Sequence, residues 1–201
     1  MNIKKDLGLF LYINLYFGYI NNGDYMKKIL LIITISLLLT GCMGLNNTPV
    51  AKVEELFNKY QTLDESVIND LNKSLEDTNY TSEEKERYKE IMKEQYKTLT
   101  YKIKDDTING DDATVEVSIM VKDFYNTLKE ASTYFANNTD EFRDGNSYTR
   151  KYNDYKLNKL KETKEKVTYT ININLIKKDG EWQIDNLSDD IIDKINGIYP
   201  Y

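Results

Sequence analysis

Two residue types that carry much of protein chemistry are nearly missing from this 201-residue chain, which has one cysteine, Cys42, and no histidine. The absence of histidine removes every Ser-His-Asp or Cys-His nucleophile pair and the usual ligands of zinc, copper and haem. A single cysteine also cannot form a disulfide within the chain. We therefore expect no metal or cofactor site, and the thiol of Cys42 is the first group whose chemistry has to be explained.

The residues before Cys42 have the layout of a secretory signal. Met26-Lys27-Lys28 is cationic, residues 29–39 are apolar, and small residues follow. The apolar run is too short to span a bilayer comfortably. Leu39-Thr40-Gly41-Cys42 resembles the lipobox of bacterial lipoproteins. This resemblance implies a diacylglyceryl group on the Cys42 sulfur and cleavage just before it; the alternative is a buried free cysteine after an ordinary signal peptide.

The chain begins with a second apolar stretch, residues 7–20, in front of the complete signal. Either this is an extra membrane-associated segment, or the reading frame has been assigned from a start upstream of the true one. We favour Met26 as the start, because codons for Gly23-Asp24 can hold a ribosome-binding sequence. The predicted organisation is an untranslated extension at 1–25, a signal peptide at 26–41, a tether at 42–48, and one domain at 49–201.

The net charge of this domain argues against nucleic acid as a partner. The whole chain has a net charge of -6. Removing residues 1–41 takes away four lysines and two aspartates, leaving 23 basic and 31 acidic side chains, or -8. Nucleic-acid phosphates require a basic surface, so we expect no nucleic-acid partner. The predicted location is the outer side of the cell membrane, where the acidic domain is held by a lipid anchor at Cys42 and repelled by anionic lipid.

Three helices are expected to open the domain. Thr48-Pro49 provides an N-cap and a proline at the first helical position. A short helix follows over residues 65–75, and Thr81 with Glu84 forms a capping-box pattern at the start of the third.

The pattern then alternates, which predicts two antiparallel hairpins with turns at Asn109-Gly110 and Asp179-Gly180. Between them lies a helical insertion at 123–166, with residues 137–146 as an exposed polar loop and a second helix at 147–166. Ser188 and Asn196-Gly197 bound a last short helix. The predicted fold is α+β, with N-terminal helices packed on a curved antiparallel sheet of about four strands.

The closing hairpin carries the sequence Lys178-Asp179-Gly180-Glu181-Trp182-Gln183-Ile184. The order of the expected elements, with helices first and a hairpin near the end, resembles that of small lipoproteins of the nuclear transport factor two-like superfamily. The resemblance implies a cone-like cystatin-type domain, and the insertion departs from its minimal pattern. The superfamily includes ketosteroid isomerases that use an inward-facing carboxylate and phenol. Here the inward strand positions carry no acid, and only Tyr101 and Tyr169 bring a hydroxyl to that face.

Two further patterns favour ordinary structure over chemistry. Residues 105–116 partly match a calcium loop, but alternating strands flank them where helices are required. The insertion carries an aromatic stripe on each helix, Phe124, Leu128 and Phe135 on one and Tyr148, Tyr152 and Tyr155 on the other. These stripes are expected to pack together, or else to present a surface to a partner.

The sequence therefore predicts a lipid-anchored module that binds an unknown protein or small apolar ligand. The alternatives are a proton-transfer enzyme of the isomerase or dehydratase type with the same fold, and a structural envelope protein. A sheet face filled by side chains favours the first, whereas an open cavity with a buried carboxylate of raised pKa favours the enzyme.

Overall fold

The computed structural model describes residues 47–145 and 147–201. The predictions for the upstream extension, the signal peptide, Cys42 and residues 42–46 of the tether lie outside the described residues.

The described chain begins with three helices, as the sequence predicts: α3 (Pro49–Thr62), α4 (Glu65–Ser74) and α5 (Ser82–Thr98). The Thr48 hydroxyl accepts a hydrogen bond from the Ala51 amide at 3.1 Å and caps α3. At the start of α5, Thr81 and Glu84 form the predicted capping box. Local hydrogen bonds to the first free amides therefore fix where these helices start.

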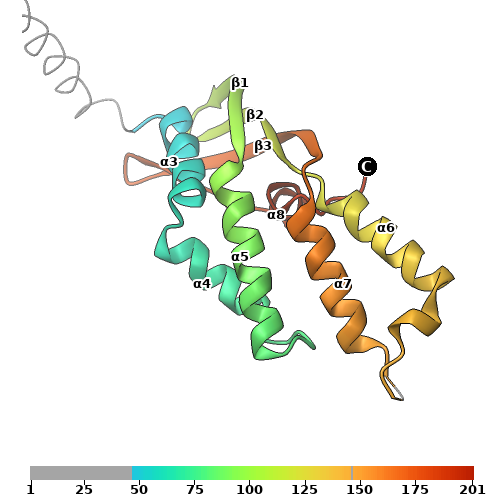
Figure 1. Cartoon of the computed structure of the whole chain (residues 1–201). Coiled ribbons are helices and arrows are strands. Elements are labelled where there is room, and N and C mark those ends of the chain that lie inside the picture. The colour runs from blue at the N-terminus through green and yellow to red at the C-terminus, as the bar shows by residue number, and fades with distance from the viewer. Residues whose placement is uncertain (1–46, 146) are drawn as a thin grey trace, which may run out of the picture. The chain divides into compact units, whose positions relative to one another are not determined.

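A four-stranded antiparallel sheet follows, built from β1 (Thr100–Asn109), β2 (Asp112–Lys122), β3 (Lys166–Lys178) and β4 (Glu181–Ile184) in the order β1-β2-β3-β4 (Figure 1). The long helical insertion separates β2 from β3, yet these strands pair along their whole length, from Asp112 with Ile176 to Lys122 with Lys166. The α+β class, the antiparallel sheet and the insertion between two hairpins are all confirmed.

The two hairpin turns differ in how well the sequence predicts them. Asp179 (φ 52°) and Gly180 (φ 84°) join Lys178 to Glu181 in the left-handed conformation that a tight hairpin turn requires. In the first hairpin Asn109 pairs with Asp112. The turn is therefore Gly110-Asp111, one residue later than the predicted Asn109-Gly110, because Asn109 is still part of the strand ladder.

The insertion consists of α6 (Phe124–Asn137), a short 3-10 helix η2 (Thr139–Phe142) and α7 (Thr149–Glu162), and α8 (Asp189–Asn196) follows the sheet. Two predictions were wrong here. Residues 137–146 are not simply an exposed polar loop, because Phe142 in η2 is only 5% exposed. The second helix also ends at Glu162 rather than near 166, where β3 has already begun.

One face of the sheet forms the core. Its inward side chains on β2 and β3 are buried: Val115, Val117, Ile119, Val121, Tyr169, Ile171, Ile173 and Leu175. The alternate positions are polar and largely exposed, such as Thr168, Thr170 and Asn172. Helices α3, α5 and α8 all contact β2. Within the described residues, no helix combines the length and hydropathy needed to cross a bilayer.

Candidate functional site

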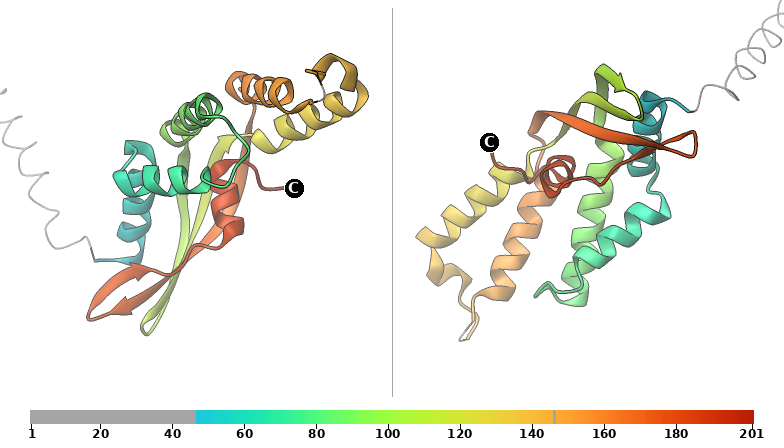
Figure 2. Two further views of the ribbon diagram at one scale, coloured as in Figure 1. Left: turned by 90° about the horizontal axis from the view of Figure 1, so that it is seen from below. Right: turned by 180° about the vertical axis from the view of Figure 1, so that it is seen from behind.

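A groove of about 580 Å³ lies between α5 and α7. We call it the α5–α7 groove. The two helices lie side by side in Figures 1 and 2. The residues that line the groove come from α5, from the end of β2 and from α7: Glu86, Arg87, Glu90, Ile91, Glu94, Lys122, Leu157, Asn158 and Lys161.

Arg87 ties the two walls of the groove together. One terminal nitrogen of its guanidinium donates to Asp154 Oδ1 at 2.5 Å, and the other donates to Asn158 Oδ1 at 3.1 Å. Both acceptors lie on α7, one turn apart, so they face α5 together. The planar fork of an arginine suits such a two-point contact. This contact sets the spacing of α5 and α7 at one end of the groove.

The floor of the groove is apolar and its rim is charged. Ile91 and Leu157 are 7% and 1% exposed, and they belong to the main core. Glu86, Glu90 and Glu94 follow one another at four-residue steps along α5, about 6 Å apart per step. Apolar contact at the bottom and charges at the edge are the usual features of a site that binds a partly apolar ligand.

Glu90 on the rim is suited to binding as a carboxylate rather than to donating a proton. Lys93 donates to Glu90 Oε1 at 2.7 Å. This hydrogen bond is the main reason that the pKa of Glu90 lies below its ordinary value, with the charge of Lys93 adding to it. A general acid at neutral pH needs the opposite shift.

Two buried carboxylates, Glu84 and Asp123, serve as helix caps and do not line the groove. Glu84 Oε2 accepts the Thr81 amide at 2.7 Å, while Oε1 has no partner among the described residues. Asp123 Oδ1 accepts the Asn126 amide at 3.1 Å and caps α6. Its Oδ2 accepts the hydroxyl of Tyr201 at 2.5 Å. Both carboxylates therefore stabilise the starts of helices.

The two inward phenols also belong to the core. The hydroxyl of Tyr169 donates to the Tyr199 carbonyl at 2.9 Å, and burial raises its pKa to about 12. Tyr101 stacks on Phe57 with ring centroids 4.6 Å apart. Neither phenol lines the α5–α7 groove, so the structure does not bring the candidate hydroxyls to the cavity.

The acidic clusters noted in the sequence lie on ordinary elements. Residues 105–116 form β1, its turn and the start of β2. Asp189 and Asp190 occupy the first turn of α8, where their negative charges interact favourably with the helix dipole. Partial burial, followed by the charges of these two neighbours, raises the pKa of Asp193. In the parts of the chain that the structure describes, no three His, Cys, Asp or Glu residues gather as a metal site would require.

The aromatic stripes of the insertion pack against each other. Phe135 stacks on Tyr152 at 4.3 Å and Tyr134 stacks on Tyr155 at 5.3 Å, measured between ring centroids. Phe142 contacts Tyr134, Phe135, Tyr152 and Tyr155 edge-on. These rings form a satellite core, whereas Phe124 and Leu128 of the α6 stripe pack with the main core. The central residue of the satellite core, Phe142, was missed because a single aromatic among charged neighbours has no periodicity.

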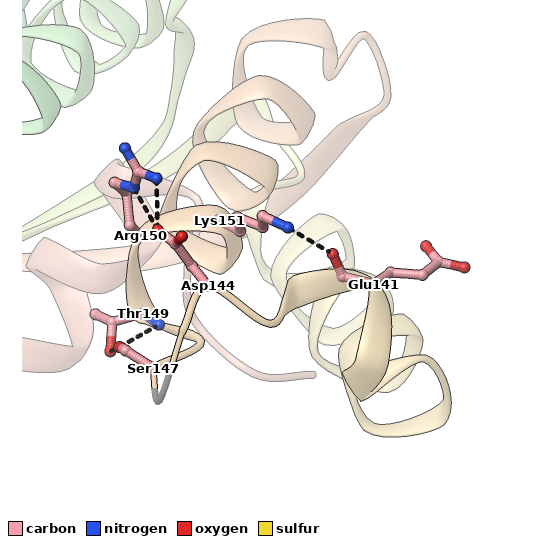
Figure 3. A network of polar contacts seen from close by, with 6 residues as sticks. All are labelled: Glu141, Asp144, Ser147, Thr149, Arg150 and Lys151. Atoms are coloured by element: carbon pink, nitrogen blue, oxygen red, sulfur yellow. Dashed lines mark hydrogen bonds and ion pairs between the residues drawn. The ribbon is translucent and has the colours of Figure 1, made fainter.

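Polar contacts close the tip of the insertion beyond this aromatic core (Figure 3). Arg150 Nε donates to Asp144 Oδ2 at 2.8 Å, and the Lys151 ammonium donates to the Glu141 carbonyl. The Thr149 amide donates to the Ser147 hydroxyl at 3.2 Å. All six residues belong to the insertion itself, so the tip is held by its own contacts.

The predicted lipidation site, Cys42, lies outside the described residues, and its modification stays a prediction.

Comparison with known proteins gives a distant structural match. No family model matches the chain, and no curated protein matches it. Among solved structures, it is similar to the "putative lipoprotein (ycdA)" of Bacillus subtilis, with 14% identity and a TM-score of 0.41. The match covers 73% of this chain and 46% of the other, so this chain spans about half the length of that protein. The resemblance to nuclear transport factor two-like lipoproteins stays a prediction.

Proposed function

We propose that this chain is a lipid-anchored extracytoplasmic binding protein, and that the α5–α7 groove is its binding site. The anchor rests on the sequence from Met26 to Cys42, in which a complete signal ends on the only cysteine of the chain. Two acyl chains on that residue would hold the protein stably, whereas one chain binds a membrane only marginally.

The observation that supports binding is the apolar floor of the groove beneath a rim of mixed charge. Ile91 and Leu157 supply a patch for an apolar group. Glu94 comes from the end of α5 that leads into the sheet, Lys122 from the end of β2, and Lys161 from the last turn of α7. No ion pair involves these three side chains among the described residues, so their charges are free to pair with a ligand. The ligand class that fits is a small molecule or peptide segment with an apolar group and at least one charge.

The positions of the carboxylates favour a binding protein over a proton-transfer enzyme. A proton-transfer site needs a desolvated carboxylate aimed at the substrate. The buried carboxylates Glu84 and Asp123 cap helices, and the groove acids are on an exposed rim. The inner face of the sheet is filled by its own apolar side chains, which leaves a surface groove between helices as the place for a ligand.

Site-specific photocrosslinking in intact cells tests the binding site. A photoreactive residue in place of Asn158, on the groove, should yield a discrete crosslinked product. The same residue in place of Thr170, on the uncovered polar face of the sheet, is the matched control and should not yield that product. Lys161→Glu would reverse a charge on the exposed rim and should weaken the product, with circular dichroism as the check that the fold survives. Identical products from both positions, or no product from Asn158, would contradict the proposed site.

A further inference from the structure

The first described residue, Asn47, is bound to the distant β3–β4 hairpin. Its side-chain amide nitrogen donates to the Gly180 carbonyl at 2.8 Å, and its side-chain oxygen accepts the Trp182 amide at 2.8 Å. Gly180 and Trp182 lie 133 and 135 positions after Asn47 in the sequence, and the two polar atoms of the Asn47 side chain bind one each. The point at which the chain enters the domain is therefore fixed to the hairpin turn.

The predicted tether between Cys42 and Asn47 is short. Four residues, 43–46, lie between Cys42 and Asn47, so five residue-to-residue steps join them. A fully extended chain spans at most about 3.6 Å per residue, so Asn47 lies within about 18 Å of the Cys42 backbone. A lipid on Cys42 would thus hold Asn47, and with it the β3–β4 turn, close to the bilayer surface.

The described domain has two different ends. The β1–β2 and β3–β4 turns lie near the start of α3, whereas the tip of the insertion between α6 and α7 lies at the other end in both views of Figure 2. Helix α7 has 14 residues and is about 21 Å long, and it runs from this tip towards the sheet. The hairpin turns and the insertion tip therefore lie at opposite ends of the described domain.

Resting on the proposed lipid anchor, we infer that the two hairpin turns face the membrane and that the insertion tip points away from it. The membrane-facing end of this orientation is strongly acidic on the β1–β2 hairpin, where Asp105, Asp106, Asp111 and Asp112 are exposed. Lys177 and Lys178 on β3 only partly offset these charges. An anionic lipid surface repels such an end within a Debye length of about 8 Å, so the domain stands on its tether without inserting. The aromatic insertion is then the part presented to the extracytoplasmic space.

The single tryptophan of the chain makes this orientation measurable. Trp182 lies next to the β3–β4 turn and is the only tryptophan in the sequence. The lipidated protein, purified from cell membranes and reconstituted into vesicles that contain a dansyl-headgroup lipid, should show strong energy transfer from Trp182. A paired variant, Trp182→Phe with Tyr148→Trp, moves the donor to the insertion tip and should show several-fold weaker transfer.

A variant with a longer tether provides a second test of the orientation. A flexible Gly/Ser insert between Gly44 and Leu45, twice the length of the tether, should weaken transfer from Trp182 and reduce the difference between the two donors. Equal transfer from both donors, or stronger transfer from position 148, in protein that remains on the vesicles would overturn the orientation and leave the anchor standing. Protein that carries no acyl chain on Cys42 would contradict the proposed function, and the orientation with it.

Discussion

The side chain of Gln95 pairs with the backbone of Lys122 as a neighbouring strand would. Its Oε1 accepts the Lys122 amide at 2.9 Å, and its Nε2 donates to the Lys122 carbonyl at 3.2 Å and to the Asn196 carbonyl at 3.2 Å. Gln95 is 0% exposed. One buried side chain on α5 thus joins the end of β2 to the end of α8, beside the groove that Lys122 lines.

Replacement of Gln95 by leucine should destabilise the protein by about 3 kcal/mol, because each buried polar group left without a partner costs about 1–3 kcal/mol. Leucine removes the partner of the Lys122 amide and of the two carbonyls. The matched control is Gln183→Leu on exposed β4, which should cost less than about 0.5 kcal/mol. Urea unfolding of both variants measures the difference, and equal midpoints would show that the Gln95 contacts contribute nothing.

Gly197 should tolerate no side chain, because two constraints act on it. Its φ is 76°, and a Cβ there would lie 2.2 Å from the Lys122 carbonyl oxygen and 2.6 Å from Gln95 Nε2. Gly110 has a similar φ of 65° but open space around it. Gly110→Ala should therefore show only the backbone cost of about 1–2 kcal/mol, whereas Gly197→Ala should lose about 4 kcal/mol or more. Similar unfolding free energies for the two alanine variants would contradict the close approach.

Stability should fall in alkaline solution as buried tyrosines ionise. Burial raises the pKa of Tyr60, Tyr88 and Tyr169 to about 12, from an ordinary value of 10. The unfolded chain then loses these protons first, so the stabilisation is complete below pH 10 and is lost as the pH rises towards 12. Urea midpoints measured from pH 9 to 12 test this window. Tyr88→Phe should flatten the decline, and an unchanged slope in that variant would exclude Tyr88 as a contributor.

Phe142→Ala should loosen the insertion without unfolding the sheet. Phe142 contacts four other aromatic rings but belongs to the satellite core rather than the main core. Loss of a buried phenylalanine costs about 3–5 kcal/mol, and here the cost should fall on α6, η2 and the start of α7. Amide hydrogen exchange should speed up there and stay slow in β2 and β3. Faster exchange throughout the sheet would show that the insertion and the main core unfold together.

The features that the sequence predicted are those fixed by neighbouring residues. Thr48 and Thr81 cap helices through amides three residues away. Asp179 and Gly180 form a hairpin turn because both adopt a positive φ. The alternation in β2 and β3 identified the buried face correctly. For this reason the fold class and most helices and strands could be predicted from the sequence.

The candidate site could not be predicted in the same way, because it is made by residues far apart in the chain. Arg87 and Asp154 are 67 positions apart, and nothing in the spacing of either indicates the other. Gln95 looks like any polar residue on a helix until Lys122 and Asn196 are placed beside it. Only the packing of α5 against α7 creates the groove.

Acylation of Cys42 is the most direct test of the central claim that the protein is anchored by lipid outside the cytoplasm. Cells expressing the wild-type chain or Cys42→Ala are grown with radioactive palmitate, and the protein is isolated and counted. The account predicts label on the wild-type protein, none on Cys42→Ala, and loss of the variant from the membrane fraction. Equal label on both proteins, or no label on either, would contradict it.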